Sequence, residues 1–368
     1  MCPPRARHCA QARPSPNQAR RKENAMSYIA AQTRQAVHRL AQRYRRHEQR
    51  QKERGDFQRL CAVHGLRLSW RNFLDVKEQT GCSVREYFLF RFYERPAALR
   101  ETFMTTVQRD AFVACIGDDS SCNASTPGNK ILFNMLFEPY LCREWLNPTA
   151  VSPEEFAAFV KRHGRVMVKP ACDGQGKGIF AYSYEGDEAA MACHKKLAGE
   201  TMLVEQMPTQ HPQLDRLNPN CLNTVRFTTY TDRDAAHVLM ATLRSATDAS
   251  VVDNFHAGGI AMAVDLETGC VVSDGVDEEG RRFSTHPHTL VPLHGFQLPN
   301  WAEALSVVRR ASREMYNLPR CRFLGWDIAF LRNGQIAVIE CNWQQGMQTQ
   351  APHDCGFRLA LKALEKRR

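Results

Sequence analysis

The sequence predicts an α+β protein in which two lobes follow a helical N-terminal region. Short apolar runs of strand length alternate with amphipathic helical segments from residue 111 onward. Two pairs of these runs read as hairpins, one closed through a glycine-rich loop after Lys169 and one through Asn333-Gly334. We therefore divide the chain into residues 1–25, a helical region at 26–110, a first lobe with the glycine-rich loop at 111–205 and a second lobe at 206–368.

The N-terminal quarter is predicted to be helical after a short leader. Residues 1–25 are rich in Pro, Arg and Gln and lack the apolar stretch of a signal peptide, so we expect them to be disordered or, if translation starts at Met26 rather than Met1, not translated. A second helix is predicted over Phe57 to His64, with Gly65 as its stop, and a third over Val84 to Glu94, ended by Pro96. The first, a basic amphipathic helix, is indicated by apolar residues at helical spacing, namely Ile29, Val37, Leu40 and Tyr44.

The two lobes are predicted from alternating strand and helix patterns. Ala111–Ile116 is predicted to be a short buried strand, and Lys130 is predicted to begin a helix. Ser152-Pro-Glu-Glu155 favours another helix start, because Pro suits the first helical position and acids suit the positive end. A long amphipathic helix is predicted over Trp301–Met315. Further strands are predicted at Ile179–Tyr184, Thr201–Gln206, Val225–Thr231, Val238–Leu243, Ile260–Val264 and Val271–Gly275.

Composition argues against several classes of protein. No run of eighteen apolar residues exists, so no transmembrane helix is expected. The 14 cysteines are scattered without a Cys-x-x-Cys pair, which disfavours a zinc site or a disulfide framework and suits a reducing cytoplasm. Residues 1–54 contain fourteen Lys and Arg but three acids, a surplus of +11, so the rest of the chain carries −1 of the net +10. We read the basic front as a solvated helix and do not expect nucleic-acid binding.

The C-terminal hairpin predicts a magnesium site. If Asn333-Gly334 turns the chain back, Asp327 lies beside Glu340 on the neighbouring strand. Asn342 stands two residues after Glu340 and shares its face of the strand. Two carboxylates and an amide oxygen are the hard ligands that suit Mg²⁺ carrying nucleotide phosphates. A solvated hairpin with charged tips is the alternative, which the apolar run before Glu340 disfavours.

The glycine-rich loop predicts contact with phosphate. An apolar strand ends at Lys169, and glycines at 174, 176 and 178 follow in a loop that also holds Lys177. Glycine lets backbone N–H groups approach phosphate oxygens, while lysine supplies positive charge. The spacing fits neither a P-loop nor a dinucleotide-binding fingerprint, and a strand rather than a helix follows. A hairpin folding over a nucleotide is the remaining interpretation.

Taken in order along the chain, these motifs resemble the ATP-grasp superfamily, and within it the sugar-transfer-associated, alpha-L-glutamate ligase-related branch. The resemblance runs from about Gly117 to the C-terminus. Thirteen residues separate Asp327 from Glu340 and two more reach Asn342, which matches the magnesium signature of the superfamily. The other motifs are Asn129-Lys130, Val168-Lys-Pro170, Gly174-x-Gly-x-Gly178, Leu203-Val-Glu-Gln206, Gln210-His211, Asn223-Thr-Val-Arg226, Asp253 to Gly259, His286-Pro287 and Gly325-Trp-Asp327.

The resemblance implies a role for each candidate residue. Lys130 and Lys169 would approach the phosphates from two sides, and Glu205-Gln206-Met207 would form the hinge that reads adenine. Arg226 would grip a carboxylate and then an acyl phosphate, although a structural ion pair is its alternative. Asn254 and His256 would position the acceptor substrate, and His256 could equally be a hydrogen-bonded structural group. His211 and His286 share that ambiguity, and neither is taken as a metal ligand.

The implied activity is that of an ATP-dependent carboxylate–amine ligase. ATP and Mg²⁺ are the expected cofactors, small-molecule or peptide-like carboxylates and amines the expected substrates, and the cytoplasm the expected location. The product would be an amide, in modification of a polysaccharide or a peptide-like molecule. Two alternatives stay open: an ATP-dependent small-molecule kinase, and a non-catalytic nucleotide-binding partner protein. The sequence names neither substrate nor oligomeric state.

Overall fold

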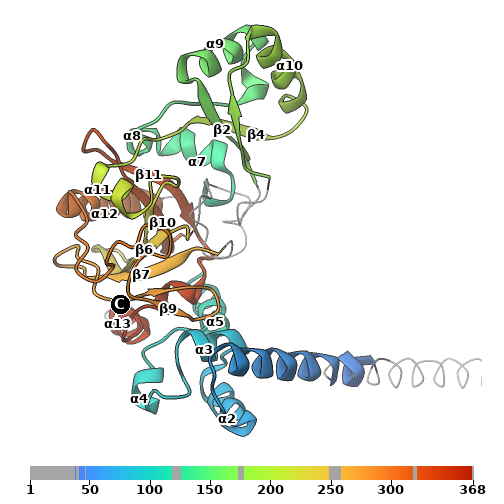
Figure 1. The fold of residues 1–368 in the computed structure, drawn as a ribbon, viewed down its shortest axis with the longest axis vertical. Helices are drawn as coiled ribbons and strands as arrows, with labels where there is room; N and C mark the ends of the chain where they lie inside the picture. Colours follow the sequence, from blue (N-terminus) through green and yellow to red (C-terminus); the bar gives the residue numbers. More distant parts are fainter. Residues whose placement is uncertain are drawn as a thin grey trace, which may run out of the picture. The chain divides into compact units, whose positions relative to one another are not determined.

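Figure 1 shows the computed structural model of the chain, which describes residues 38, 41–45, 47–117, 126–172, 178–247, 258–317 and 321–366. The chain divides into two compact units, residues 1–59 and residues 60–368. In the first unit the described residues are helical and nearly all exposed, as the predicted basic helix requires. Residues 1–25 and the apolar positions Ile29, Val37 and Leu40 lie outside the described residues. No helix in the described ranges is long and apolar enough to cross a bilayer.

The second unit begins with short helices, and two predictions made there are wrong. The predicted helix Val84–Glu94 ends at Leu89, because Arg91 adopts a left-handed φ of 51° and the amide of Phe92 returns to the carbonyl of Tyr87 at 2.9 Å. This turn stacks Phe90 on Phe103 and places Phe92 edge-to-face against the same ring. The helices of this region are α2 (Trp70–Thr80), α3 (Val84–Leu89), α4 (Ala97–Arg100) and α5 (Thr106–Ile116).

The predicted strand Ala111–Ile116 is the second half of helix α5, so the boundary drawn at residue 111 falls inside a helix. A capping box fixes where α5 begins: the Thr105 side chain accepts from the amide of Gln108, and the Gln108 side chain accepts from the amide of Thr105. Gly117 ends the helix in a left-handed conformation. A short apolar run is compatible with either structure, and the cap decides for the helix.

The first lobe is a four-stranded antiparallel sheet covered on one face by two helices (Figure 1). Val166 and Val168 on β2 point into the core formed with α9 and α10, whereas Met167 and Lys169 alternate to the other face. The helix start predicted at Ser152 is confirmed, and a capping box between Ser152 and Glu155 opens α9. The sheet order is β1-β4-β2-β3, with β1 at Trp145–Leu146, β2 at Arg165–Pro170, β3 at Phe180–Ser183 and β4 at Met202–Gln206; the helices are α9 (Pro153–His163) and α10 (Asp187–Leu197).

The second lobe is a seven-stranded antiparallel sheet in the order β11-β10-β5-β6-β7-β8-β9. Helix α12 (Trp301–Asn317) packs its apolar side on one face. The predicted strand Val271–Gly275 is wrong in extent: Val271 makes an isolated bridge with Val264, and the strand proper is Gly275–Val276. The strands are β5 (Thr224–Thr231), β6 (Ala236–Ser245), β7 (Ile260–Val264), β8 (Gly275–Val276), β9 (Arg282–Phe283), β10 (Phe323–Phe330) and β11 (Ile336–Asn342).

Shorter elements complete the unit. They are the helices α7 (Lys130–Leu136), α8 (Glu138–Leu141), α11 (Pro212–Leu217) and α13 (Arg358–Glu365), and the 3₁₀ turns η1 (Thr126–Gly128), η2 (Pro148–Ala150) and η4 (Met347–Gln350). Helix α7 begins at Lys130 as predicted, and the Asn129 side chain caps it by accepting from the amides of Ile131 and Leu132. Antiparallel sheets with helices confirm the predicted α+β class.

The large sheet has one apolar face and one polar face. Successive residues of a strand point to opposite sides, so Val225 and Phe227 join the core with α12 while Arg226 points the other way. The polar face carries Thr224, Arg226 and Thr228 on β5, Thr242 and Arg244 on β6, Asp327 on β10, and Glu340 and Asn342 on β11. A buried polar face needs partners, and it marks this side of the sheet as the candidate site.

Residues 344–356, here named the C-terminal segment, lie against part of that polar face. The Gln345 amide donates to the carbonyl of Leu324 at 3.0 Å and accepts from the Thr228 hydroxyl at 2.9 Å. Thr242 donates to the carbonyl of Thr349 at 2.9 Å. A Cβ on Gly325 would lie 2.7 Å from Gln345 Oε1, so this position requires glycine for the segment to approach so closely.

The helices at the start of the second unit, here called the front helices, contact the other side of the C-terminal segment. Gln350 exchanges hydrogen bonds with the backbone of Met104, at 3.0 Å and 2.8 Å. The buried guanidinium of Arg95 donates to the carbonyls of His353 and Asp354. A Cβ on Gly356 would lie 2.4 Å from Phe103 Cα, so the two backbones touch. The front helices are therefore packed parts of the second unit.

Candidate active site

The predicted hairpin exists and brings two acids together. Asp327 and Glu340 are direct partners across β10 and β11, and Gly334 takes a left-handed φ of 85° in the connecting turn. The Asn342 amide donates to Glu340 Oε1 at 3.0 Å. Asp327 is buried, whereas the Glu340 side chain is 41% exposed. The three predicted metal ligands thus lie at one edge of the polar face.

Two arginines hold Asp327 from the neighbouring strands. Arg226 stands opposite it on β5 and donates to both carboxylate oxygens, the Nη2–Oδ2 bond measuring 2.8 Å. Arg244 on β6 lies 3.1 Å from Oδ2. Burial alone would raise the pKa of Asp327, but the two guanidinium groups outweigh it and hold the pKa well below its usual range. Partial burial and the neighbouring Asp327 charge raise the pKa of Glu340 instead.

Arg244 was missed by the sequence analysis. The predicted strand Val238–Leu243 stopped one residue short of it, whereas β6 continues to Ser245. Its signal was the alternation Thr242-Leu-Arg244, which puts Arg244 on the face of Thr242 once the strand is extended. Thr242 pairs with Arg226, so both arginines share a face.

A second charged cluster lies on the first lobe. Lys169 donates to Glu205 Oε2 at 2.5 Å, Arg143 reaches Oε1 at 2.7 Å, and the Asn134 amide donates to the same oxygen at 2.9 Å. Glu205 and Arg143 side chains are each 2% exposed. Burial would raise the pKa of Glu205, but Arg143 and Lys169 overcome it and hold the pKa well below its usual range. The carboxylate of Glu205 therefore orients the lysine.

Lys130 lies at the same end of β2. Its amide donates to the carbonyl of Ala171 at 2.8 Å, and its Nζ donates to the carbonyl of Pro170 at 3.2 Å. Burial lowers the pKa of Lys130; the Glu340 charge opposes that change and the Lys169 charge adds to it. Lys130 is consequently within electrostatic reach of both Lys169 and Glu340.

The residues predicted to form the adenine-binding hinge, Glu205 to Met207, lie at the end of β4. Gln206 is tied to Glu144 through its amide, at 2.9 Å, and through its side chain, which accepts from the Glu144 amide at 3.1 Å. Met207 is the first residue beyond the strand and is half-buried. Adenine recognition by this stretch stays a prediction.

Part of the predicted site lies outside the described residues: Gly174, Gly176 and Lys177 of the loop, and Asn254 and His256. Gly178 is described and takes a left-handed φ of 70°. A Cβ there would lie 2.9 Å from Pro170 Cγ, so glycine allows the loop to return close to the end of β2.

Three other motif residues are structural. Gln210 accepts from the backbone and side chain of Asn223, at 3.0 Å and 2.9 Å, and both are buried. His211 caps helix α11 by accepting from the amide of Gln213. His286 is fully buried between Ser245 and the carbonyl of Ala246, and burial lowers its pKa, so the ring is neutral.

The donors on the hairpin fit magnesium. No cluster of three or more His, Cys, Asp or Glu side chains suited to a metal occurs in the described ranges. Asp327, Glu340 and Asn342 form a set of two carboxylates and one amide. Mg²⁺ is commonly bound by one or two carboxylates plus substrate phosphates and water, so such a set suits a metal that arrives with a nucleotide.

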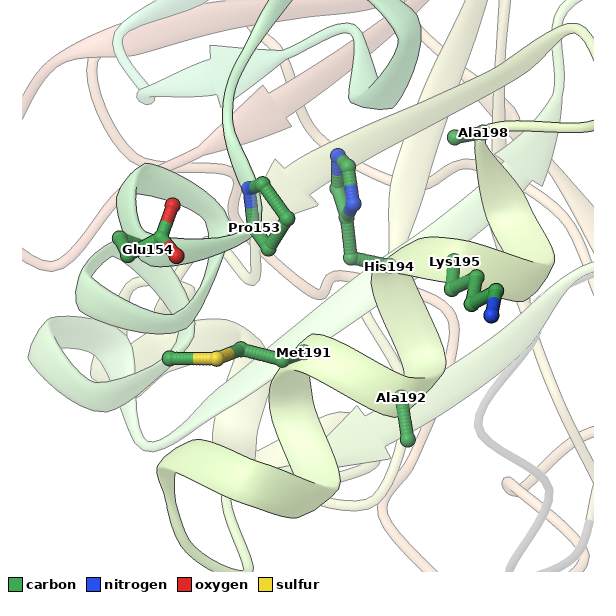
Figure 2. A pocket seen from close by; sticks show the side chains of 7 residues that line it. All are labelled: Pro153, Glu154, Met191, Ala192, His194, Lys195 and Ala198. Atoms are coloured by element: carbon green, nitrogen blue, oxygen red, sulfur yellow. The ribbon is translucent and has the colours of Figure 1, made fainter.

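An apolar groove of about 550 Å³ lies elsewhere, between α9 and α10 (Figure 2). Pro153 and Glu154 line it from α9, and Met191, His194 and Lys195 from α10. His194 bonds the carbonyl of Pro148 at 2.8 Å and so serves the packing of this lobe. None of the candidate site residues lines the groove.

Residues 150–366 match the family described as sugar-transfer associated ATP-grasp. No curated protein sequence matches the chain. Among solved structures, the chain is similar to D-cycloserine synthetase DcsG, with 15% identity over 72% of this chain and 80% of that one and a TM-score of 0.43.

Two further solved structures are similar at the same level. D-alanyl-alanine synthetase A from Vibrio cholerae O1 biovar eltor str. N16961 shares 14% identity over 66% of this chain and 65% of its own, with a TM-score of 0.41. The ATP-grasp ligase PsnB, solved with a phosphomimetic variant of its minimal precursor, Mg and ADP, shares 14% identity over 67% of this chain and 59% of its own, with a TM-score of 0.40. The chain spans less than two thirds of these two enzymes.

Proposed function

Because the chain belongs to the sugar-transfer associated ATP-grasp family, we propose that it is an ATP-dependent ligase that joins a carboxylic acid to an amine. One observation carries the proposal. Lys130, at the end of β2, lies within electrostatic reach of both Lys169 and Glu340, and Glu340 stands on an edge where Asp327 is paired with Arg226. We therefore assign the cations for a polyphosphate, the oxygen donors for a metal and the guanidinium for an anion to one site.

The first step activates the acid. A carboxylate oxygen attacks the γ-phosphorus of ATP, the bond from that phosphorus to the β–γ bridging oxygen breaks, and ADP leaves with an acyl phosphate formed. Lys130 and Lys169 bind phosphate oxygens, and Glu205 orients Lys169. Arg226, with Arg244 beside it, binds the carboxylate and later the acyl phosphate through its planar fork. Positioning and charge neutralisation account for such phosphoryl transfer without a covalent nucleophile.

The second step forms the amide. The amine nitrogen attacks the acyl carbon, the carbon–oxygen bond to phosphate breaks, and phosphate leaves while the amine proton passes to solvent. Asn254 and His256 are our candidates for positioning the amine. Asp327, Glu340 and Asn342 would hold Mg²⁺, which neutralises charge on the phosphates when bound.

The substrates are proposed by class. We favour a small-molecule or peptide-like acid and amine, with a product in polysaccharide or peptide-like modification and a relationship to alpha-L-glutamate ligases. A cytoplasmic location suits a chain whose described cysteines are all free thiols.

A product screen tests the proposal. Purified protein is mixed with ATP, Mg²⁺ and candidate acid–amine pairs, ADP release is followed, and products are identified by mass spectrometry. We expect ADP and an amide that depend on both substrates. A phosphoester would establish the kinase alternative, and the absence of any nucleotide binding in calorimetry would refute an ATP-dependent enzyme.

A further inference from the structure

The carboxylate of Asp327 is enclosed by positive charge. Arg226 donates to both of its oxygens, and Arg244 lies 3.1 Å from one of them. Glu340, the second carboxylate, lies 4.0 Å from Arg226 Nη2. Two carboxylates therefore share a small volume with two guanidinium groups, and their formal charges cancel.

A divalent cation approaching this place alone meets no attraction from net charge. Lys130 adds further positive charge near Glu340. The oxygens of Asp327 also already accept charge-assisted hydrogen bonds, which must be given up before they can ligate a metal. Two carboxylates that could ligate a metal are present, but the arginines compete with the cation for Asp327.

A polyphosphate changes this balance. Guanidinium groups bind phosphate with the same bidentate geometry that they use for carboxylate, so phosphate or acyl-phosphate oxygens can replace Asp327 as their partner. Arg244 keeps a second anchor during such an exchange, because its Nη2 donates to the Thr224 hydroxyl at 2.6 Å. Asp327 is then released toward Glu340 and Asn342.

We infer that Arg226 and Arg244 exclude a free divalent cation from the Asp327–Glu340 site, so that the metal enters only together with the nucleotide. This rests on the proposed function, since it takes Asp327, Glu340 and Asn342 as the metal ligands. Arg244 thereby gains a role of its own as a positioning residue for Asp327. The protein carries no resident magnesium between turnovers.

Manganese binding to the full-length protein tests the inference without any substrate acid or amine. Electron paramagnetic resonance measures free Mn²⁺ during titration of wild type, Arg244→Gln, Arg244→Lys and Arg233→Gln, all without nucleotide. Arg233 is the matched control: it contacts Asp234 in the turn between β5 and β6, with its side chain 90% exposed. Removing one unit charge about 5 Å from a dication is expected to tighten binding roughly tenfold even at the dielectric constant of water.

The outcomes separate cleanly. We expect weak Mn²⁺ binding by wild type, Arg244→Lys and Arg233→Gln, and roughly tenfold tighter binding by Arg244→Gln. Equal affinity in Arg244→Gln and wild type would overturn the inference, as would an Arg244→Lys protein that behaves like Arg244→Gln. If Arg244→Gln fails to fold in a melting experiment, wild type alone decides: Mn²⁺ binding as tight without the non-hydrolysable nucleotide AMP-PNP as with it refutes the exclusion. Failure of AMP-PNP to bind at all, by calorimetry, would instead remove the proposed function.

Discussion

Replacing Glu205 with Gln is expected to destabilise the first lobe strongly. The change keeps the size of the side chain and the hydrogen bond from Asn134, but it removes the charge that faces Lys169 at 2.5 Å and Arg143 at 2.7 Å. The Arg143 side chain is 2% exposed, so water cannot compensate it. Breaking a buried ion pair from one side costs about 3–5 kcal/mol, and we expect a loss of that size.

Urea unfolding followed by circular dichroism measures this loss, with Glu144→Gln as the matched control. Glu144 pairs with Arg162 where both side chains are more than half exposed, so its loss is expected to cost about 1 kcal/mol or less. A Glu205→Gln protein within about 1 kcal/mol of wild type would refute the assignment of a buried charge cluster.

The stabilities of the wild type and of Glu205→Gln are expected to depend differently on pH. The folded-state pKa of Glu205 is depressed, because Arg143 and Lys169 outweigh the effect of burial. Its contribution to stability is therefore complete above the unfolded pKa of about 4.3 and is lost as the pH falls below it toward the folded value. Between pH 7 and pH 3 the wild type is expected to lose more stability than Glu205→Gln, and parallel curves would contradict this.

The remaining predictions concern the nucleotide site and the leader. Glu340→Gln is expected to abolish turnover while leaving nucleotide binding largely intact, because it removes a metal ligand and spares the hinge; wild-type turnover by this variant with a verified substrate pair would disprove the metal assignment. Lys169→Ala is expected to weaken AMP-PNP binding by ~1.5–3 kcal/mol, the loss of one charged hydrogen bond, and an unchanged affinity in calorimetry would remove Lys169 from the phosphate site. Arg226→Ala is expected to lower kcat/KM for the acid, because a contact made in the transition state is lost, and an unchanged kcat/KM would remove Arg226 from the carboxylate site. Deleting residues 1–25 is expected to leave the melting temperature unchanged, and a drop of many degrees would show that they pack.

Local signals made much of the second lobe predictable. Asn333-Gly334 specifies a tight turn, and the strands on either side then bring Asp327 opposite Glu340. The helix starts at Lys130 and Ser152 were predictable for the same reason, since their determinants lie within a few residues. A capping box at Thr105 was equally readable, and overlooking it led to the wrong strand at Ala111–Ile116.

The pairing of charges could not be predicted in this way. The partners of Asp327 are 101 residues away at Arg226, and those of Glu205 include Lys169, 36 residues away. Strand order decides which residues meet, and nothing in the sequence near Arg226 states that β5 lies between β10 and β6. The sequence indicated a carboxylate-gripping arginine or a structural ion pair, and the structure shows the ion pair to Asp327.

The hold of the front helices on the C-terminal segment has a consequence for synthesis on the ribosome. Arg95 bonds the carbonyl of Asp354, which is 259 residues later, and Met104 bonds Gln350 after 246 residues. At roughly 5–20 residues per second, translation needs on the order of ten seconds to a minute to deliver these partners. During that interval the front helices lack part of their native packing, because the backbone of Gly356 is not yet in place against Phe103. Contacts of such long sequence separation also slow refolding. A chain that loses its last few dozen residues therefore also loses part of the packing of its front helices.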